Sequence, residues 1–466
     1  MTERRVAESD SKMPRQIPFI IGNEVCERFS FYGMRNILMI FLIDYLLVSV
    51  VPDAKLREEL AKERLHYFVA GVYFFPLLGG FLADRFLGKY RTIFWLSLVY
   101  CAGHACLAIF ESSVTGFFLG LGLIALGSGG IKPCVSAMVG DQFTEKNKHL
   151  VKTVFSIFYF SINFGSFFAS LLIPLTLRRW GPAVAFGIPG ILMGIATFIF
   201  WLGRKKYAHV PPSGGNNPHS FFRVLWSAIT NPRTNGFLSG AEKDHPKDAV
   251  EGVRAVLRLM LLFSPIPVFP MLFDQKASTW VVQARSMDPQ VGPFKFEPAQ
   301  MQLINPALVM ILIPFTAGVV YPAFKRAGYE LTPLRRMTIG LILGASSYVV
   351  AGLINVPVEA GERLTILWQI APYILLTTAE ILVSTTGLEF AYSQAPLSMK
   401  GTIMSFWNLT FAIGNLTVAQ IAARKLFTGT PNFFFYAGLC LAGGILFGLL
   451  AWWYKPVDHF RKDGAR

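Results

Sequence analysis

Ionisable residues interrupt the first apolar stretch of this chain at positions where a lipid bilayer would penalise them. Four of them fall within twelve residues: Glu24, Glu27, Arg28 and Arg35. Because each residue advances a helix by about 100°, these side chains and Tyr32 share less than half of its circumference. A charge near the centre of a lone spanning helix costs roughly 3 kcal/mol. The stripe therefore predicts a water-filled path or a site for a charged solute; a static cluster of ion pairs between helices is the alternative.

Three later apolar stretches each carry a further charge, at Lys132, Asp274 and Glu380. Lys132 and Arg35 belong to the first half of the chain, whereas Asp274 and Glu380 belong to the second half. If the halves face each other, cationic side chains oppose anionic ones across a central cavity. That polarity suits a solute with a carboxylate at one end and an ammonium at the other. The alternative is that the four groups neutralise one another, in pairs that can also open and close as gates.

The buried carboxylates are also candidates for proton carriers. A carboxyl group that loses its cationic partner in a buried site becomes easier to protonate. Glu24, Glu27 and Glu380 are the candidates, because each has Arg or Lys as a potential partner. A proton that enters down 100 mV releases roughly 2.3 kcal/mol. We therefore expect protons as the coupling ion and no other cofactor.

The composition is that of a polytopic membrane protein. The chain has 466 residues, of which 53% are hydrophobic and 15% are charged, whereas soluble domains average about 25% charged residues. The net charge of +15 comes from basic residues in short loops between apolar segments, a pattern typical of cytoplasmic loops and not of nucleic-acid binding. The five cysteines lack metal-ligand spacing, and the sequence contains no P-loop, Gly-x-Ser-x-Gly or His-Glu-x-x-His motif. We therefore expect no enzyme, no metal site and no obligate protein partner.

Twelve segments of the sequence are predicted to cross the membrane, a crossing that takes about 20 residues of helix. They lie near 17–49, 65–86, 92–111, 114–140, 152–177, 183–203, 255–284, 300–325, 335–355, 364–391, 400–424 and 428–454. Lys and Arg gather in alternate loops on the side of both termini, which is therefore predicted to be cytoplasmic. Pro265, Pro267 and Pro270 predict a bend in the seventh segment, either as a hinge or as a fixed kink.

A polar connector rich in Pro, Gly and Asn separates the first six segments from the last six. The predicted parts are a cytoplasmic tail at 1–16, a six-helix bundle at 17–203, a cytoplasmic linker at 204–254, a second bundle at 255–454 and a tail at 455–466. Two such halves with a site at their interface are typical of secondary transporters. The predicted fold class is thus an all-α polytopic membrane protein with 12 transmembrane helices in two six-helix bundles.

Four short motifs follow one another along the chain. They span Glu24 to Gly33, Gly80 to Arg91, Gly127 to Pro133 and Phe155 to Ser166. In these motifs the chain resembles the proton-coupled oligopeptide transporter (POT/PTR) family of the major facilitator superfamily, with Phe31 in place of a family tyrosine. The segments around His66 and Asp274, and the stretch 387–396, are most similar to animal-type members.

The resemblance implies a role for each matching residue. Proton coupling would involve Glu24, Glu27, Arg28 and His66. Substrate binding would involve Tyr32, Arg35, Tyr73, Lys132, Asn163, Asn305, Glu380, Ser384 and Trp407. In that set, Arg35 and Lys132 would hold the peptide carboxylate, and Glu380 with the two asparagines its amino terminus or backbone. Gate pairs would form between Arg35 and Asp274, and between Lys132 and either Glu380 or Glu27.

The function implied by the resemblance is proton-coupled import of di- and tripeptides by alternating access. A related transporter of another small anion or zwitterion, such as an amino acid, nitrate or a drug-like compound, is the first alternative. A substrate sensor without flux is the second. The expected partners are di- and tripeptides, protons and the lipid bilayer, and the compact length favours a bacterial inner membrane with both termini cytoplasmic.

Overall fold

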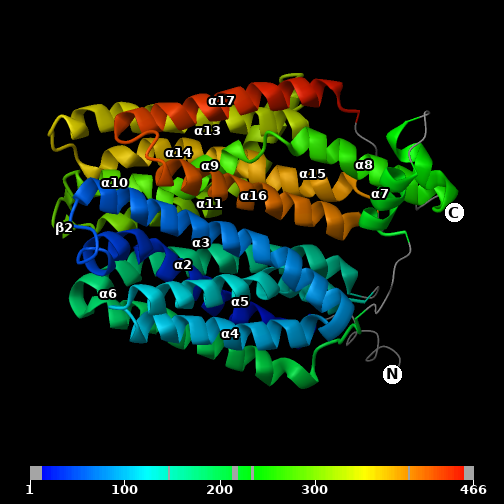
Figure 1. Ribbon diagram of the computed structural model, residues 1–466, viewed down its shortest axis with the longest axis horizontal. Coiled ribbons are helices and arrows are strands. Elements are labelled where there is room, and N and C mark those ends of the chain that lie inside the picture. The colour runs from blue at the N-terminus through cyan, green and yellow to red at the C-terminus, as the bar shows by residue number, and fades with distance from the viewer. Residues whose placement is uncertain (1–12, 145–146, 213–218, 232–235, 397–398, 456–466) are drawn as a thin grey trace.

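The computed structural model describes residues 13–144, 147–212, 219–231, 236–396 and 399–455, and there the chain is almost entirely helical. Among these residues, nine helices are long and apolar enough to cross a membrane, and one bent pair makes a tenth. The long helices lie side by side along the longest axis of the molecule (Figure 1). The predicted all-helical polytopic class is therefore confirmed.

The first half of the chain forms long helices joined by short turns. They are α2 (Ile17–Phe41), α3 (Ala54–Leu82), α4 (Lys89–Ile109), α5 (Val114–Asp141) and α6 (Val151–Leu202), with π-helical turns over Leu42–Leu46 and Ala83–Leu87. Helix α3 starts well before the predicted residue 65, because Asp53 caps it: its carboxylate accepts the Leu56 N–H at 2.7 Å. The charged residues that follow Asp53 thus continue the helix beyond its apolar part.

Helix α6 supplies two of the predicted segments, the fifth and the sixth. Its 52 residues are interrupted at Gly181, where φ is 80°, a conformation that favours glycine and breaks a helix. Gly33 of α2 lies against both Ile173 and Pro189. The parts of α6 before and after Gly181 therefore pack side by side on α2, as two helices would.

The second half is built from more broken helices. They are α8 (Lys247–Phe263), α9 (Val268–Phe273), α10 (Thr279–Arg285), α11 (Ile304–Phe315), α12 (Tyr321–Arg326), α13 (Pro333–Glu359), α14 (Ile370–Glu380), α15 (Thr386–Gln394), α16 (Lys400–Ala423) and α17 (Thr430–Trp453). A small antiparallel hairpin of β1 (Gln290–Val291) and β2 (Phe294–Lys295) follows α10. Each predicted segment thus has a helical counterpart. However, α16 is not among the described helices that are both long and apolar enough to cross a membrane. The count of twelve spans therefore stays a prediction.

The predicted bend in the seventh segment is present. Helix α8 and the α9–α10 segment meet at 42°, and the residues at the break include Pro265 and Pro267, which lack the N–H that a continuous helix needs. The segment begins at Lys247 and not at 255. Whether the bend acts as a hinge stays a prediction.

The hydrophobic interior consists of two separate cores. One contains residues of the first half, such as Met34, Phe117 and Phe186. The other contains residues of the second half, such as Trp280 and Tyr436. The molecule therefore has two packed bodies, as the predicted pair of bundles requires.

The described part of the linker predicted at 204–254 contains a helix, which the sequence had not indicated. The hydroxyl of Tyr207 donates to the Phe200 carbonyl at 2.9 Å and holds the start of the linker on the first core. The amphipathic helix α7 (Phe221–Thr230) instead packs its Phe221 and Val224 into the second core. We call the end of the molecule with α7 the linker end and the opposite end, with β1 and β2, the hairpin end (Figure 1).

Candidate functional site

An ion pair joins the two halves of the molecule in its interior. Arg35 comes from α2, and Asp274 begins a 3-10 turn (Asp274–Ala277) between α9 and α10. The Nη2 atom of Arg35 lies 2.5 Å from Oδ1 of Asp274, and Asp274 is fully buried. Removing one partner of such a buried pair typically costs about 3–5 kcal/mol. The structure thus brings the first predicted gate pair together.

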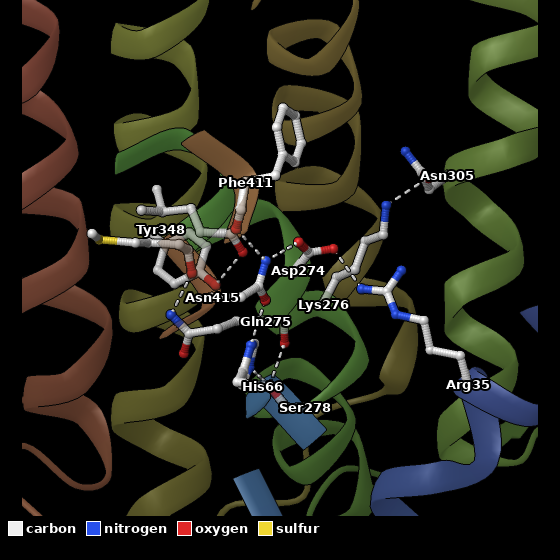
Figure 2. A network of polar contacts seen from close by, with 12 residues as sticks. Arg35, His66, Asp274, Gln275, Lys276, Ser278, Asn305, Tyr348, Phe411 and Asn415 are labelled. Carbon is white, nitrogen blue, oxygen red and sulfur yellow. Dashed lines mark hydrogen bonds and ion pairs between the residues drawn. The ribbon is translucent and has the colours of Figure 1, made fainter. Parts of the chain in front are cut away.

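A chain of hydrogen bonds runs from this ion pair to His66 (Figure 2). Asn415 of α16 donates through Nδ2 to Oδ2 of Asp274 at 2.7 Å, and its Oδ1 lies 2.8 Å from Nδ1 of His66. The other ring nitrogen of His66 lies 2.9 Å from the Ser278 hydroxyl. Because Asn415 directs its oxygen toward Nδ1 of His66, Nδ1 is the donor in this arrangement. His66 on α3 is therefore connected to the ion pair through one amide group.

A second chain of contacts holds Glu380 and includes a lysine that the sequence analysis did not select. The ammonium of Lys276 donates to Oδ1 of Asn305 at 2.7 Å. Asn305 in turn donates to Oε2 of Glu380 at 2.7 Å, and to Thr377 at 3.1 Å. Glu380 ends α14 where a π-helical turn (Ile381–Thr385) begins, a feature frequent at functional sites. Lys276 is a buried charge in an apolar segment. Because a charge within an apolar segment is costly, Lys276 could have been selected from the sequence as Asp274 was.

Lys132 of α5 makes neither of its two predicted ion pairs. Its ammonium lies 4.5 Å from the centre of the Phe31 ring and 5.0 Å from that of Tyr73. Among the described residues, none of the ion pairs within 4 Å involves Lys132. Two aromatic rings stabilise this cation by cation–π interaction, and a gate pair with Glu380 or Glu27 remains a prediction for another conformation.

The acidic residues of α2 share one arginine. Nε of Arg28 lies 2.7 Å from Oε1 of Glu24 and 2.8 Å from Oε2 of Glu27. Glu24 and Glu27 are both buried, so a single cation stands between two carboxylates. One proton on either carboxyl group would balance this cluster, which is the arrangement that proton uptake requires.

Other predicted residues lie on the elements that surround these contacts. Trp407 of α16 is buried and packs edge-on against Phe263, at 5.4 Å between ring centres. Asn163 of α6 donates to the Tyr159 carbonyl of its own helix at 3.0 Å. Ser384 lies in the π-helical turn after Glu380.

The charged side chains surround a common interior region. Tyr32 lies within electrostatic reach of Arg28, Arg35 and Glu380, and Lys132 within reach of Glu27 and Asp274. The predicted meeting of charges from both halves is therefore present. Asn415, which joins His66 to Asp274, and Ser278, which contacts the other ring nitrogen of His66, were not predicted, because a polar residue inside a span does not reveal its partner.

Further contacts between the halves gather toward the hairpin end. Arg285 of α10 pairs with Asp44 at 2.6 Å, and Arg178 of α6 pairs with Glu297 at 2.7 Å. The side chain of Gln302 donates to the Asn36 carbonyl at 3.0 Å. These bonds, together with the buried gate pair, hold the two halves together at the hairpin end.

A multi-pass helical membrane protein whose halves meet around ionised side chains belongs to the class of secondary transporters. A protein-family model described as the POT family (PTR2) matches residues 90–428. The chain therefore belongs to the POT family, and its fold is that of the major facilitator superfamily. It is an integral multi-pass membrane protein.

Individual relatives agree with this family. The chain is 38% identical over 372 residues to "Solute carrier family 15 member 2" from Homo sapiens, covering 75% of this chain and 50% of that one. It is 36% identical over 382 residues to "Peptide transporter 3" from Caenorhabditis elegans, covering 77% and 53%. The crystal structure of the POT family transporter PepTSo is 50% identical, with a TM-score of 0.89 and coverage of 96% and 100%. The chain spans about half the length of the curated relatives it matches.

Proposed function

We propose that this protein imports di- and tripeptides together with protons by alternating access. One relative with 36% identity is named a peptide transporter, and the family is one of transporters and not of enzymes. The buried carboxylates and their shared arginine, described above, support protons as the coupling ion. Peptides, protons and the bilayer are the partners in this proposal.

The observation that carries the proposal is the opposition of charges across the interior. Arg35 and Lys132 come from the first half, whereas Glu380 comes from the second and is held by Asn305 at 2.7 Å. A zwitterionic peptide would place its carboxylate near the two cations and its ammonium near the carboxylate. Charge-assisted hydrogen bonds at both ends would then select for length and for free termini.

Proton coupling is assigned to the cluster of Glu24, Glu27 and Arg28 and to His66. When Arg28 is shared between two carboxylates, a change in the conformation of the Arg28 side chain leaves one of them without a cation, and this group then binds a proton. The bond from His66 to Asn415 places a second titratable group beside Asp274. A proton on His66 would thus compete with Arg35 for the charge of Asp274.

Two alternatives remain distinct from this proposal. A relative that carries an amino acid, nitrate or a drug-like compound would use the same cations, but would not need Glu380 to hold an ammonium. A sensor would bind peptide without moving it. For localisation we propose a bacterial inner membrane with the linker end, and therefore both termini, in the cytoplasm.

Uptake into proteoliposomes tests the proposal. Labelled dialanine should accumulate with an inward proton gradient and a negative interior potential, and a protonophore should abolish the accumulation. We expect Glu24→Gln to lose accumulation and to keep part of its counterflow. Uptake that ignores the protonophore would refute proton coupling, while an absence of counterflow in the unchanged protein would favour a sensor. Competition of amino acids, nitrate or drug-like compounds against labelled dialanine would separate a peptide transporter from a relative that carries another solute.

A further inference from the structure

Two rows of buried polar side chains face each other inside the first half, away from the gate. The rows consist of Asn23, Glu27 and Ser30 on α2, and of Ser97, Tyr100 and His104 on α4; each of the six is at most 1% exposed. Within each row the residues recur at intervals of three and four, which places them on one helix face. The hydroxyl of Ser30 lies 2.9 Å from Nε2 of His104 and joins the rows.

Corresponding residues of the two rows are separated by nearly the same number of positions in the sequence. His104 follows Ser30 by 74 residues, Ser97 follows Asn23 by 74, and Tyr100 follows Glu27 by 73. Both helices run from the linker end toward the hairpin end (Figure 1), and each rises by about 1.5 Å per residue. The contact between Ser30 and His104 therefore places the residues of each of the three pairs at similar positions along the helix axes. In agreement with this, Tyr100 lies within electrostatic reach of Glu27.

Most of these side chains have polar atoms without a hydrogen-bond partner among the residues that the structure describes. The atoms are Nδ2 and Oδ1 of Asn23, Oε1 and Oε2 of Glu27, Oγ of Ser97, the hydroxyl of Tyr100 and Nδ1 of His104. Of these atoms, Oε2 of Glu27 lies 2.8 Å from Nε of Arg28. Buried polar atoms nearly always have a partner. A row of unpartnered atoms on two facing helices therefore calls for a shared polar occupant.

Ordered water fits this space better than any larger ligand. Toward the hairpin end, the same face of α2 continues into a cluster of Phe41, Phe117 and Phe186, with ring centres 4.6 to 5.3 Å apart. This aromatic cluster closes the space, so a solute cannot pass through it from that end. A buried water typically makes about three hydrogen bonds, and Glu27, Tyr100 and His104 each offer at least one unpartnered atom at neighbouring heights.

We infer that ordered water lies between these rows and links the imidazole of His104 to the carboxyl group of Glu27, so that His104 is a positioning residue for the proton that Glu27 carries. The inference rests on the proposed proton coupling. In either tautomer Nδ1 of His104 needs a partner, because only Nε2 is engaged by Ser30. The water would accept a hydrogen bond from the protonated carboxyl group of Glu27 on one side and would hydrogen-bond to Nδ1 of His104 on the other.

The groups that face this site set its charge balance. They are Glu24, Glu27, Arg28 and Tyr32 on α2, Tyr100 and Cys101 on α4, and Lys132 on α5. Helix α6 packs on the same region through Gly190 and Thr197, neither of which titrates. His104 is the one imidazole among the described residues of this set, and its printed partners are Ser30 on α2 and the ring of Tyr100 on α4.

Hydroxyl-radical footprinting in ¹⁸O-labelled water tests the presence of water directly. Radicals formed from bound water oxidise the nearest side chain, even where bulk solvent has no access. Tyr348 is the matched control: like Tyr100 it is 0% exposed, but its hydroxyl donates to the Leu272 carbonyl at 2.7 Å. We expect ¹⁸O on Tyr100 at least fivefold above Tyr348. Equal labelling of the two tyrosines would overturn the inference, whatever the transport assay gives.

Transport by His104→Gln tests the role of the imidazole. The amide reaches the position of Nε2 and can still bond to Ser30, but it has no polar atom at the position of Nδ1 and it cannot titrate. We expect proton-driven dialanine accumulation to fall at least fivefold and its pH optimum to shift, while counterflow stays within twofold. Ser30→Ala, which frees the ring, should give a smaller change of the same kind.

The two assays separate this inference from the proposed function. If Tyr100 is labelled but the pH profile of His104→Gln equals that of the unchanged protein, the role of His104 is wrong. If the unchanged protein itself shows no gradient-driven uptake, the proposed function fails, and the role of His104 with it. The label on Tyr100 would still report the water.

Discussion

The ammonium of Lys132 lies 4.5 Å from the centre of the Phe31 ring, at the position where family members carry a tyrosine. The ring of Tyr73 flanks the same ammonium at 5.0 Å. None of the described ion pairs contains Lys132. Aromatic rings thus hold a positive charge inside the molecule. A peptide carboxylate could bind this ammonium, either in place of the ring contacts or in addition to them.

This arrangement predicts that Lys132→Met stabilises the protein and removes its transport. Replacing an unpaired, partly buried charge with an apolar side chain of similar length removes a desolvation cost, and we expect the melting temperature to rise by about 1–3 °C. Dialanine uptake should fall below a tenth of that of the unchanged protein, because one of the two cations proposed to bind the peptide carboxylate is lost. Thermal unfolding in detergent and proteoliposome uptake measure the two effects.

Lys89→Met is the control for this prediction. Lys89 pairs with Asp141 at 2.6 Å, so its removal leaves a carboxylate alone and should lower the melting temperature. If Lys132→Met is destabilised as much as Lys89→Met, the ammonium of Lys132 has a partner that geometry does not reveal.

Breaking the ion pair between Arg35 and Asp274 should open the hairpin end. Asp274→Asn keeps the shape of the side chain but leaves Arg35 as a lone buried charge, at a cost of about 3–5 kcal/mol to the closed form. Spin labels on the exposed residues Ser112 and Arg363, one on each half, should then report a longer-distance population that is minor in the unchanged protein.

Arg178→Ala provides the matched comparison. Its pair with Glu297 also joins the halves, but the Arg178 side chain is 53% exposed, and such surface pairs contribute only about 0–1 kcal/mol. Distance distributions should therefore stay close to those of the unchanged protein. A shift as large as that of Asp274→Asn would mean that the buried pair is not the main gate contact.

Replacing Asn415 with leucine should uncouple His66 from Asp274. The change leaves Oδ2 of Asp274 and Nδ1 of His66 without this amide, and each unsatisfied buried group costs about 1–3 kcal/mol. We expect a lower melting temperature and a pH profile of uptake that matches that of His66→Gln. Asn408→Leu on the same helix is the control and should keep the original pH profile. Different profiles for Asn415→Leu and His66→Gln would show that the two residues act separately.

Lys276 and Glu380 should behave as one unit, because Asn305 bonds to both. Lys276→Met and Glu380→Gln should each reduce kcat/KM for dialanine at least tenfold, and the double variant should be little worse than either. Such non-additivity is expected of residues that share a network. A double variant whose loss equals the product of the single losses would place Lys276 outside the site.

Much of the architecture could be predicted from the sequence. The apolar segments, the polar connector and the prolines of the seventh segment are local properties, since a span depends on its own length and composition. The start of α3 was misplaced because Asp53 caps a charged helix that hydropathy does not detect. The helix in the linker was missed because its stability depends on tertiary contacts. Phe221 and Val224 pack into the second core, and this packing stabilises the helix that carries them.

The charged residues themselves were also evident in the sequence, because an ionised group in an apolar segment is costly wherever that segment folds. By itself the sequence determined the membrane class, the family and the identity of the charges. The tertiary structure decided which side chains contact one another. Asn415 lies between Asp274 and His66, Lys276 bonds to Asn305, and Lys132 lies against two aromatic rings. These partners lie on different helices, and their distances depend on how two packed halves meet, which composition and spacing along one chain do not encode.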